Sequence, residues 1–185
     1  MHLFFRYILL GIEHVLPLGY DHVLFIVALF LLNSRLKTAV IQCTLFTIAH
    51  SITLALATFD FIHIPLQVIE TAIAFSIALV AIENLFIPTL NYLRMSLVFV
   101  FGLLHGLGFA SALNEIGIPK SELLTSLCGF NLGVEIAQLF IILICYFTLA
   151  YFWKKKEWYQ EKLIHPINMM IACIAMVIGI QRLIN

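Results

Sequence analysis

Apolar runs close to the length of a membrane-spanning helix recur along this chain, separated by short polar breaks. A helix needs about 20 residues to cross a hydrocarbon core about 30 Å thick. The composition agrees with a membrane protein, because 63% of the residues are hydrophobic and only 11% are charged, against about 25% charged in a soluble domain. We predict an all-α polytopic membrane helix bundle, a single transmembrane domain over residues 1–185, with six spans at approximately 19–32, 38–59, 66–86, 93–113, 123–153 and 167–183.

The residues before the first span (residues 1–17) form a separate segment. Apolar residues recur between His2 and Glu13, which predicts a short helix that is either interfacial or re-entrant. A cleaved signal peptide is not expected, because Glu13 and His14 interrupt the apolar core that such a peptide needs. Pro17 and Gly19 are expected to break the helix after His14. This break should make it difficult for His14 and the Asp21–His22 pair to meet at one ion without help from other helices.

The distribution of Lys and Arg predicts the orientation of the spans. The loops on one side carry most of the basic residues, namely Arg35, Lys37, Arg94, Lys154, Lys155, Lys156 and Lys162, and the other side carries Arg6, Lys120 and Arg182. We therefore predict a protein of the bacterial inner (plasma) membrane with both termini outside and the Lys-rich loop in the cytoplasm. A formal net charge of zero gives no basic surface for nucleic acid. The expected partners are the lipid bilayer and a metal ion, and a homo-oligomer is left open.

The segment from His14 to His22 contains two imidazoles and a carboxylate at the mouth of the first span, with Asp21 beside His22. Neutral imidazole and carboxylate are ligands that divalent first-row metals accept. Ionisable groups at membrane depth are costly and therefore mark candidate functional sites. Counted at about 1.5 Å per residue, other spans also place such groups in or near the outer half of the bundle. The predicted metal ligands are His14, Asp21, His22, His50, Glu70, His105 and Glu135.

Further polar residues are predicted to support this site or the path to it. Asn131, Glu135 and Gln138 have i, i+4, i+7 spacing and share one stripe of the fifth span. Ser51 lies beside His50, and Glu83 lies near the cytoplasmic end of the third span, where it could serve as an inner station for a cation. Glycines that allow helices to approach closely flank these positions, namely Gly102, Gly106, Gly108, Gly129 and Gly133.

Each polar residue also has a simpler explanation. A single intramembrane histidine is often a hydrogen-bonded packing residue, and His50 or His105 alone would be explained in this way. Glu70 could be a carboxylate favoured by the helix dipole, and Asp21 could be a helix cap. Glu83 could be a snorkelling carboxylate. The gathering of so many of these groups in one leaflet is what favours a site.

The same residues carry a resemblance to a known family. Gly11-Ile-Glu-His14 and Gly19-Tyr-Asp21-His22 resemble the opening signature of the HupE/UreJ family, and the chain is most similar to its second, divergent subgroup. The similarity extends from Gly11 to Gln138 through further segments, namely Phe46 to Leu54, Val68 to Glu70, Ala81 to Asn84, Phe101 to Ala110 and Phe130 to Glu135. Six residues separate His14 from Asp21 and His105 stands alone, which differs from the hydrogenase-associated members. The resemblance implies a multi-pass protein linked to nickel supply for hydrogenase or urease.

The leading hypothesis is a permease or facilitator for a divalent transition metal, with nickel favoured by the resemblance and zinc as the other expected ion. No nucleotide-binding motif is present, so transport would be passive or driven by a gradient. One alternative is an intramembrane zinc-dependent hydrolase, in which three histidines hold zinc and a carboxylate acts as general base. Another is a metal-binding accessory or sensor protein. No catalytic residue is predicted under the leading hypothesis.

Overall fold

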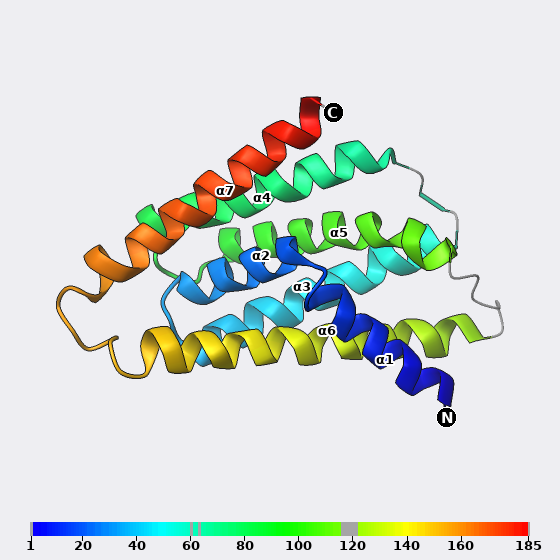
Figure 1. Ribbon diagram of the computed structural model, residues 1–185, viewed down its shortest axis with the longest axis horizontal. Helices are drawn as coiled ribbons and strands as arrows, with labels where there is room; N and C mark the ends of the chain where they lie inside the picture. The colour runs from blue at the N-terminus through cyan, green and yellow to red at the C-terminus, as the bar shows by residue number, and fades with distance from the viewer. Residues whose placement is uncertain (1, 60, 63, 116–121, 185) are drawn as a thin grey trace.

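The computed structural model describes all residues except 1, 60, 63, 116–121 and 185, and describes residues 2 and 109–115 by their backbone alone (Figure 1). This described part of the chain is helical throughout its regular elements, which confirms the all-α prediction. The elements in chain order are α1 (His2–Val15), α2 (Tyr20–Leu31), α3 (Leu36–Thr58), α4 (Leu66–Phe86), α5 (Tyr92–Glu115), α6 (Leu123–Cys145), the π-helical segments η2 (Tyr146–Ala150) and η3 (Gln160–Ile164), and α7 (His165–Ile184).

The number of spans differs from the prediction. Among the described residues, four helices are long and apolar enough to cross a membrane, and α1 with α2 forms a fifth span if the bent pair is counted as one. The predicted first span is too short alone, because the 12 residues of α2 extend about 18 Å. The described apolar part of α5 covers only Tyr92–Gly108. Six complete spans are therefore not confirmed.

The break between α1 and α2 turns the chain by 75°. The helix ends at Val15 and restarts at Tyr20, so the predicted interruption near Pro17 and Gly19 is confirmed. In Figure 1 α1 runs from the N-terminus toward the middle of the bundle, and α2 continues from there toward the opposite end. The N-terminal helix, predicted as interfacial or re-entrant, thus packs on α6 inside the bundle.

Three closely packed helix pairs, α3 with α5, α1 with α6 and α4 with α7, build the bundle, and α2 lies among them (Figure 1). Two pairs depend on glycine. A methyl group at Gly133 would overlap the Ile8 carbonyl, and one at Gly11 would overlap the Phe130 carbonyl, so α1 and α6 touch backbone to backbone. A methyl group at Gly106 would likewise overlap the His50 carbonyl of α3. The predicted small-residue packing is present, and it is α1 that packs on the glycines of α6.

The loops that carry most of the Lys and Arg residues lie together at the left end of Figure 1, which we call the lysine end. Lys154 fastens this end, because its Nζ donates to the carbonyls of Asn33 at 2.9 Å and Ser34 at 2.8 Å. Burial, with the Arg35 charge as a smaller cause, lowers the pKa of Lys154. The segment predicted as a continuous fifth span to residue 153 instead leaves α-helical geometry after Cys145. Lys120 lies outside the described residues.

Candidate metal site

Four imidazoles from four helices meet in the middle of the bundle and form what we call the histidine layer, made of His14, His22, His50 and His105. The ring of His22 lies 4.6 Å from His14, 5.9 Å from His50 and 5.2 Å from His105, measured between ring centroids. His14 and His50 are 6.2 Å apart. The rings of His14 and His22 are neighbours across the 75° bend, and α3 and α5 contribute the other two histidines of the layer.

The histidine layer lies inside the bundle rather than at its rim. His14 packs on Phe130 with ring centroids 5.4 Å apart, about 10 Å below the start of α6 at 1.5 Å per residue. His50 precedes the end of α3 by about 12 Å on the same scale. These histidines are buried, because only 5% of His22, 0% of His50 and 1% of His105 is exposed. His14 and His22, which were predicted at the mouth of the first span, line the cavity described below and also belong to this buried layer.

The nitrogen atoms of this layer have few hydrogen-bond partners. Nδ1 of His105 lies 2.7 Å from the Phe101 carbonyl oxygen, which favours the tautomer that donates from Nδ1 and leaves Nε2 as an acceptor. His105 Nε2, His22 Nε2 and both ring nitrogens of His50 are buried with no hydrogen-bond partner. Buried polar atoms are almost always paired. These nitrogens therefore need an explanation.

Three phenylalanines cover the histidine layer on the side of the lysine end, and we call them the phenylalanine layer. Each of these phenylalanines lies one helical turn from a member of the histidine layer on its own helix, namely Phe25 on α2, Phe46 on α3 and Phe101 on α5. Ring centroids of Phe25 and Phe46 lie 5.1 Å and 4.9 Å from that of His105. Phe25 and Phe46 are 0% and 1% exposed and Phe101 is 8% exposed. The histidines are thus closed off by aromatic rings toward the lysine end.

The opposite side of the histidine layer opens into a cavity of about 290 Å³. Tyr20, Asp21, Glu70 and Arg182 line this cavity with three of the four histidines, namely His14, His22 and His105. Arg182 in α7 donates from Nη2 to Asp21 Oδ2 and to the Tyr20 hydroxyl, both at 2.8 Å. Its Nε lies 3.7 Å from Glu70 Oε2. We call Asp21, Glu70 and Arg182 the mouth cluster.

A second ion pair lies beyond the phenylalanine layer, and we call it the inner pair. Arg94 Nη1 donates to Glu83 Oε2 at 2.6 Å, and the Arg94 side chain is 0% exposed. Arg94 Nε donates to Gln42 Oε1 at 2.9 Å. Gln42 in turn donates to the Leu29 carbonyl of α2 at 3.1 Å. The predicted inner station Glu83 is therefore occupied by a buried guanidinium.

The structure does not bring Glu135 to the histidines. Its Oε1 accepts from Thr44 Oγ1 at 2.7 Å, and Thr44 lies six residues before His50 on α3, or about 9 Å along the helix. Gln138 accepts from Thr47 Oγ1 at 3.1 Å. These contacts form a polar seam between α3 and α6 that is separate from the cavity. Among the other predicted residues, Ser51 donates to the Thr47 carbonyl at 2.6 Å, and Asn131 donates to the Leu127 carbonyl at 2.9 Å.

No set of three or more His, Cys, Asp or Glu side chains in the described residues has the geometry to hold a metal ion. The imidazoles are neighbours, but they are not arranged as a ready coordination sphere. Among the described cysteines, all four are free, with Cys43 and Cys145 buried and Cys128 and Cys173 exposed.

Three features were missed by the sequence analysis. Arg182 and Arg94 were counted only as charges that set the orientation, and the phenylalanine layer was not recognised. The layer had a signal in the sequence, because Phe25, Phe46 and Phe101 all stand three or four residues from a predicted ligand, on the same helix face. Nothing in the sequence indicated which carboxylate each arginine would choose.

A comparison with protein families matches residues 1–182 to the model described as HupE / UreJ protein. No curated protein and no solved structure matches the chain.

Proposed function

The chain belongs to the HupE/UreJ family, which is associated with nickel and cobalt transport, and on that premise we propose that it is a permease for a divalent transition metal, with nickel as the favoured ion. The cation enters from the outside through the mouth cluster, dwells in the histidine layer and leaves at the lysine end into the cytoplasm. His14, His22, His50 and His105 are the proposed ligands, with Asp21 and Glu70 at the entry.

The buried, unpaired imidazole nitrogens carry this proposal. An unsatisfied buried acceptor costs about 1–3 kcal/mol, and His22, His50 and His105 contribute such atoms next to one another. A divalent cation would satisfy several of them at once, because neutral imidazole is a good ligand for nickel and zinc. Since no ready metal geometry is found among the described side chains, binding would require the rings to rotate toward a common centre.

The layers suggest which side opens first. The cavity reaches the histidines from the mouth cluster, and the phenylalanine layer and the inner pair close the other side. This arrangement is what a permease loaded from the outside would show before release. An intramembrane hydrolase would need only the open side, so transport is the property that separates the two hypotheses.

The test is nickel uptake into proteoliposomes that contain a nickel-sensitive dye. We expect His50→Ala to reduce uptake at limiting nickel on the order of tenfold or more, because loss of a group that supports a metal site costs about 10–100-fold. His165→Ala is the matched control, since His165 lies at the start of α7, at the lysine end, and should leave uptake unchanged. Equal uptake by His50→Ala and the unmodified protein would reject the permease.

Glu135→Gln asks a separate question in the same assay. Glu135 lies on the polar seam between α3 and α6, so we expect its replacement to reduce uptake less than His50→Ala does. A loss as large as that of His50→Ala would place Glu135 at the transport site, as the sequence analysis predicted.

A further inference from the structure

Arg182 lies where an entering cation would meet its first carboxylates. The guanidinium donates to Asp21 Oδ2 at 2.8 Å and to the Glu70 backbone carbonyl at 3.1 Å. Its carbon lies 5.6 Å from the centre of the Tyr20 ring. The side chains of Arg182 and Asp21 are only 16% and 19% exposed. Contacts to α2 and α4 therefore hold one fixed positive charge at the wall of the cavity.

This positive charge and a metal ion compete for the same carboxylate, that of Asp21. Asp21 Oδ1 is buried without a hydrogen-bond partner, so Oδ2 is the oxygen that Arg182 occupies. Two carboxylates and one guanidinium give the mouth cluster a formal charge of −1, whereas the carboxylates alone would give −2. A divalent cation at Asp21 would lie next to the guanidinium, and like charges at such distances repel strongly where water is scarce.

We propose that Arg182 is a tethered competitor that weakens cation binding at the mouth, and that a divalent ion passes only by displacing it from Asp21. This inference rests on the proposed function and adds a residue that determines affinity and selectivity. A monovalent ion recovers too little attraction to displace the guanidinium, whereas a divalent ion recovers more. Rapid release toward the histidines follows, because the returning guanidinium lowers the affinity of the mouth for the ion.

Two substitutions separate the charge of Arg182 from its shape. Arg182→Gln removes the competitor, and we expect the KM for nickel uptake to fall about fivefold, the ratio that corresponds to about 1 kcal/mol of lost competition from a partly exposed pair. The maximal rate should fall as well, because the ion leaves the mouth more slowly. Arg182→Lys keeps the charge and should restore most of both values. Arg6→Gln is the matched control, because Arg6 is exposed on α1.

A merely structural role for Arg182 predicts the opposite pattern. If Arg182 only ties α7 to α2 and α4, Arg182→Gln would raise the KM or leave it unchanged, and either result would overturn the inference. The monovalent ions supply a second readout of the same idea. Potassium should inhibit nickel uptake more strongly in Arg182→Gln than in the unmodified protein, and equal inhibition counts against a role in selectivity.

A measurement on the protein without substitutions covers the case in which the variants do not fold. Phenylglyoxal modifies accessible guanidinium groups, and the modified sites can be quantified by mass spectrometry. We expect nickel to increase modification of Arg182, with the fully buried Arg94 as an internal reference that stays unmodified. Unchanged or decreased modification of Arg182 would contradict displacement.

The outcomes for the inference and for the proposed function are distinguishable. Unmodified protein that carries nickel, together with an unchanged KM in Arg182→Gln, rejects the competitor and leaves the permease standing. Unmodified protein that neither binds nor carries nickel overturns both.

Discussion

The Arg182–Asp21 and Arg94–Glu83 ion pairs have the same chemistry and opposite surroundings. At the mouth, Arg182 lies 2.8 Å from Asp21, and the two side chains are 16% and 19% exposed beside a cavity. In the inner pair, Arg94 lies 2.6 Å from Glu83, with side chains 0% and 11% exposed. The contrast teaches that the surroundings determine what an ion pair can do. The mouth pair can exchange partners with an entering ion, whereas the inner pair is closed.

The two ion pairs differ because leaving a charge without a partner costs more free energy when that charge is buried. A partly exposed pair contributes about 0–1 kcal/mol, because water replaces much of what is lost when it opens. A buried charge that loses its partner costs about 3–5 kcal/mol. The inner pair should therefore hold the lysine end shut until something replaces its contacts.

Replacing Arg94 should have the largest effect on stability. Arg94→Met leaves Glu83, which is only 11% exposed, without its partner and also removes the donor to Gln42. We expect a loss of about 3–5 kcal/mol in the free energy of unfolding, measured by denaturant titration in a mild detergent.

The double variant Arg94→Met with Glu83→Gln is the control, because it removes both charges and should recover much of the loss. A loss below about 1 kcal/mol for Arg94→Met alone would show that the inner pair behaves like the mouth pair, and the comparison would fail.

Glycine substitutions give an intermediate effect and test the packing on either side of the histidine layer. A methyl group at Gly106 would overlap the His50 carbonyl, so Gly106→Ala must push α5 from α3. We expect a loss of about 1–3 kcal/mol in the free energy of unfolding.

Gly108→Ala is the matched control on the same helix. Gly108 lines the cavity, and a methyl group there would approach only side chains, those of Ile73 at 3.2 Å and Ile69 at 3.5 Å. Equal losses for the two variants would mean that the mouth side is packed as tightly as the α3–α5 contact.

Arg182→Gln should have a small effect on stability, in contrast to Arg94→Met. The mouth pair is partly exposed, so we expect the free energy of unfolding to fall by about 1 kcal/mol or less. The same titration measures this, with Arg6→Gln as the reference for an exposed charge. A loss of several kcal/mol would show that the main role of Arg182 is to hold α7 against α2 and α4.

The salt dependence should be the smallest effect. Raising the ionic strength from about 0.1 M to 1 M shortens the screening length from about 10 Å to about 3 Å. We expect this change to remove most of the stability difference between Arg182→Gln and the unmodified protein. The difference for Arg94→Met should persist. Equal sensitivity of both differences to salt would mean that water and ions reach the inner pair as well.

The sequence was enough to predict the helical class, the approximate positions of the helices and some of the residues that gather at the candidate site. His50 and His105 could be placed at one depth, because depth follows from counting residues along a helix of constant rise, whereas His22 was placed nearer the outer end of its span. The α2 segment was predicted as a complete span, since hydropathy alone does not report that α1 and α2 are two halves of one bent pair.

The remaining features depend on contacts between distant helices. The 75° bend between α1 and α2 includes Gly19, where a methyl group would overlap the His14 carbonyl, and α1 also packs on α6 through Gly11 and Gly133. Glu135 contacts Thr44, about 9 Å along α3 from His50. The relative positions of α3 and α6 along their axes decide this, and spacing within α6 leaves them undetermined.

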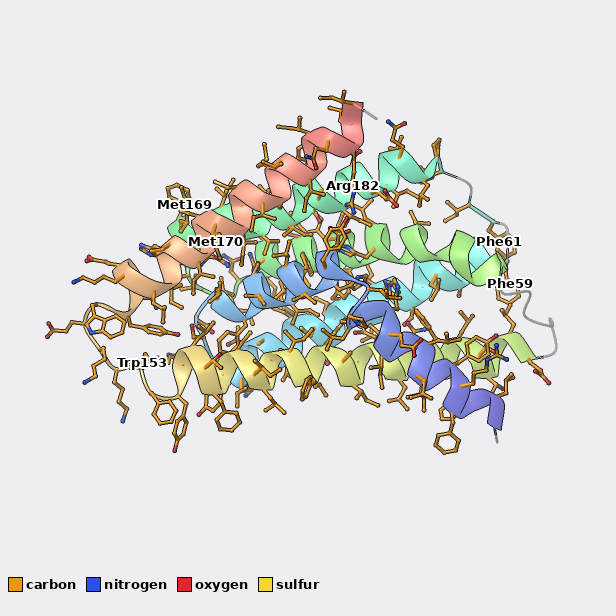
Figure 2. The ribbon with its side chains drawn as sticks, viewed as in Figure 1. Phe59, Phe61, Trp153, Met169, Met170 and Arg182 are labelled. Carbon is orange, nitrogen blue, oxygen red and sulfur yellow. The ribbon has the colours of Figure 1, made fainter. Side chains whose placement is uncertain are left out.

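The pairing of α4 with α7 has a mechanical consequence. Gly179 of α7 packs on Phe75 of α4, and Asn84 of α4 donates to Asn168 of α7 at 2.8 Å. These two helices therefore pack together along much of their length. Figure 2 shows Arg182 near one end of this α4–α7 unit and Met169 and Met170 near the other. Other polar bonds connect this unit to α2 and α5.

These bonds cross the boundary at both ends of the unit. Arg182 reaches Asp21 of α2 at the mouth. Beyond the phenylalanine layer, Asn84 reaches the Ala28 carbonyl of α2 at 2.7 Å and Glu83 reaches Arg94 of α5. A tilt of α4 and α7 together would therefore stretch the Arg182–Asp21 contact at the mouth and the Asn84 and Glu83 contacts at the far end at the same time.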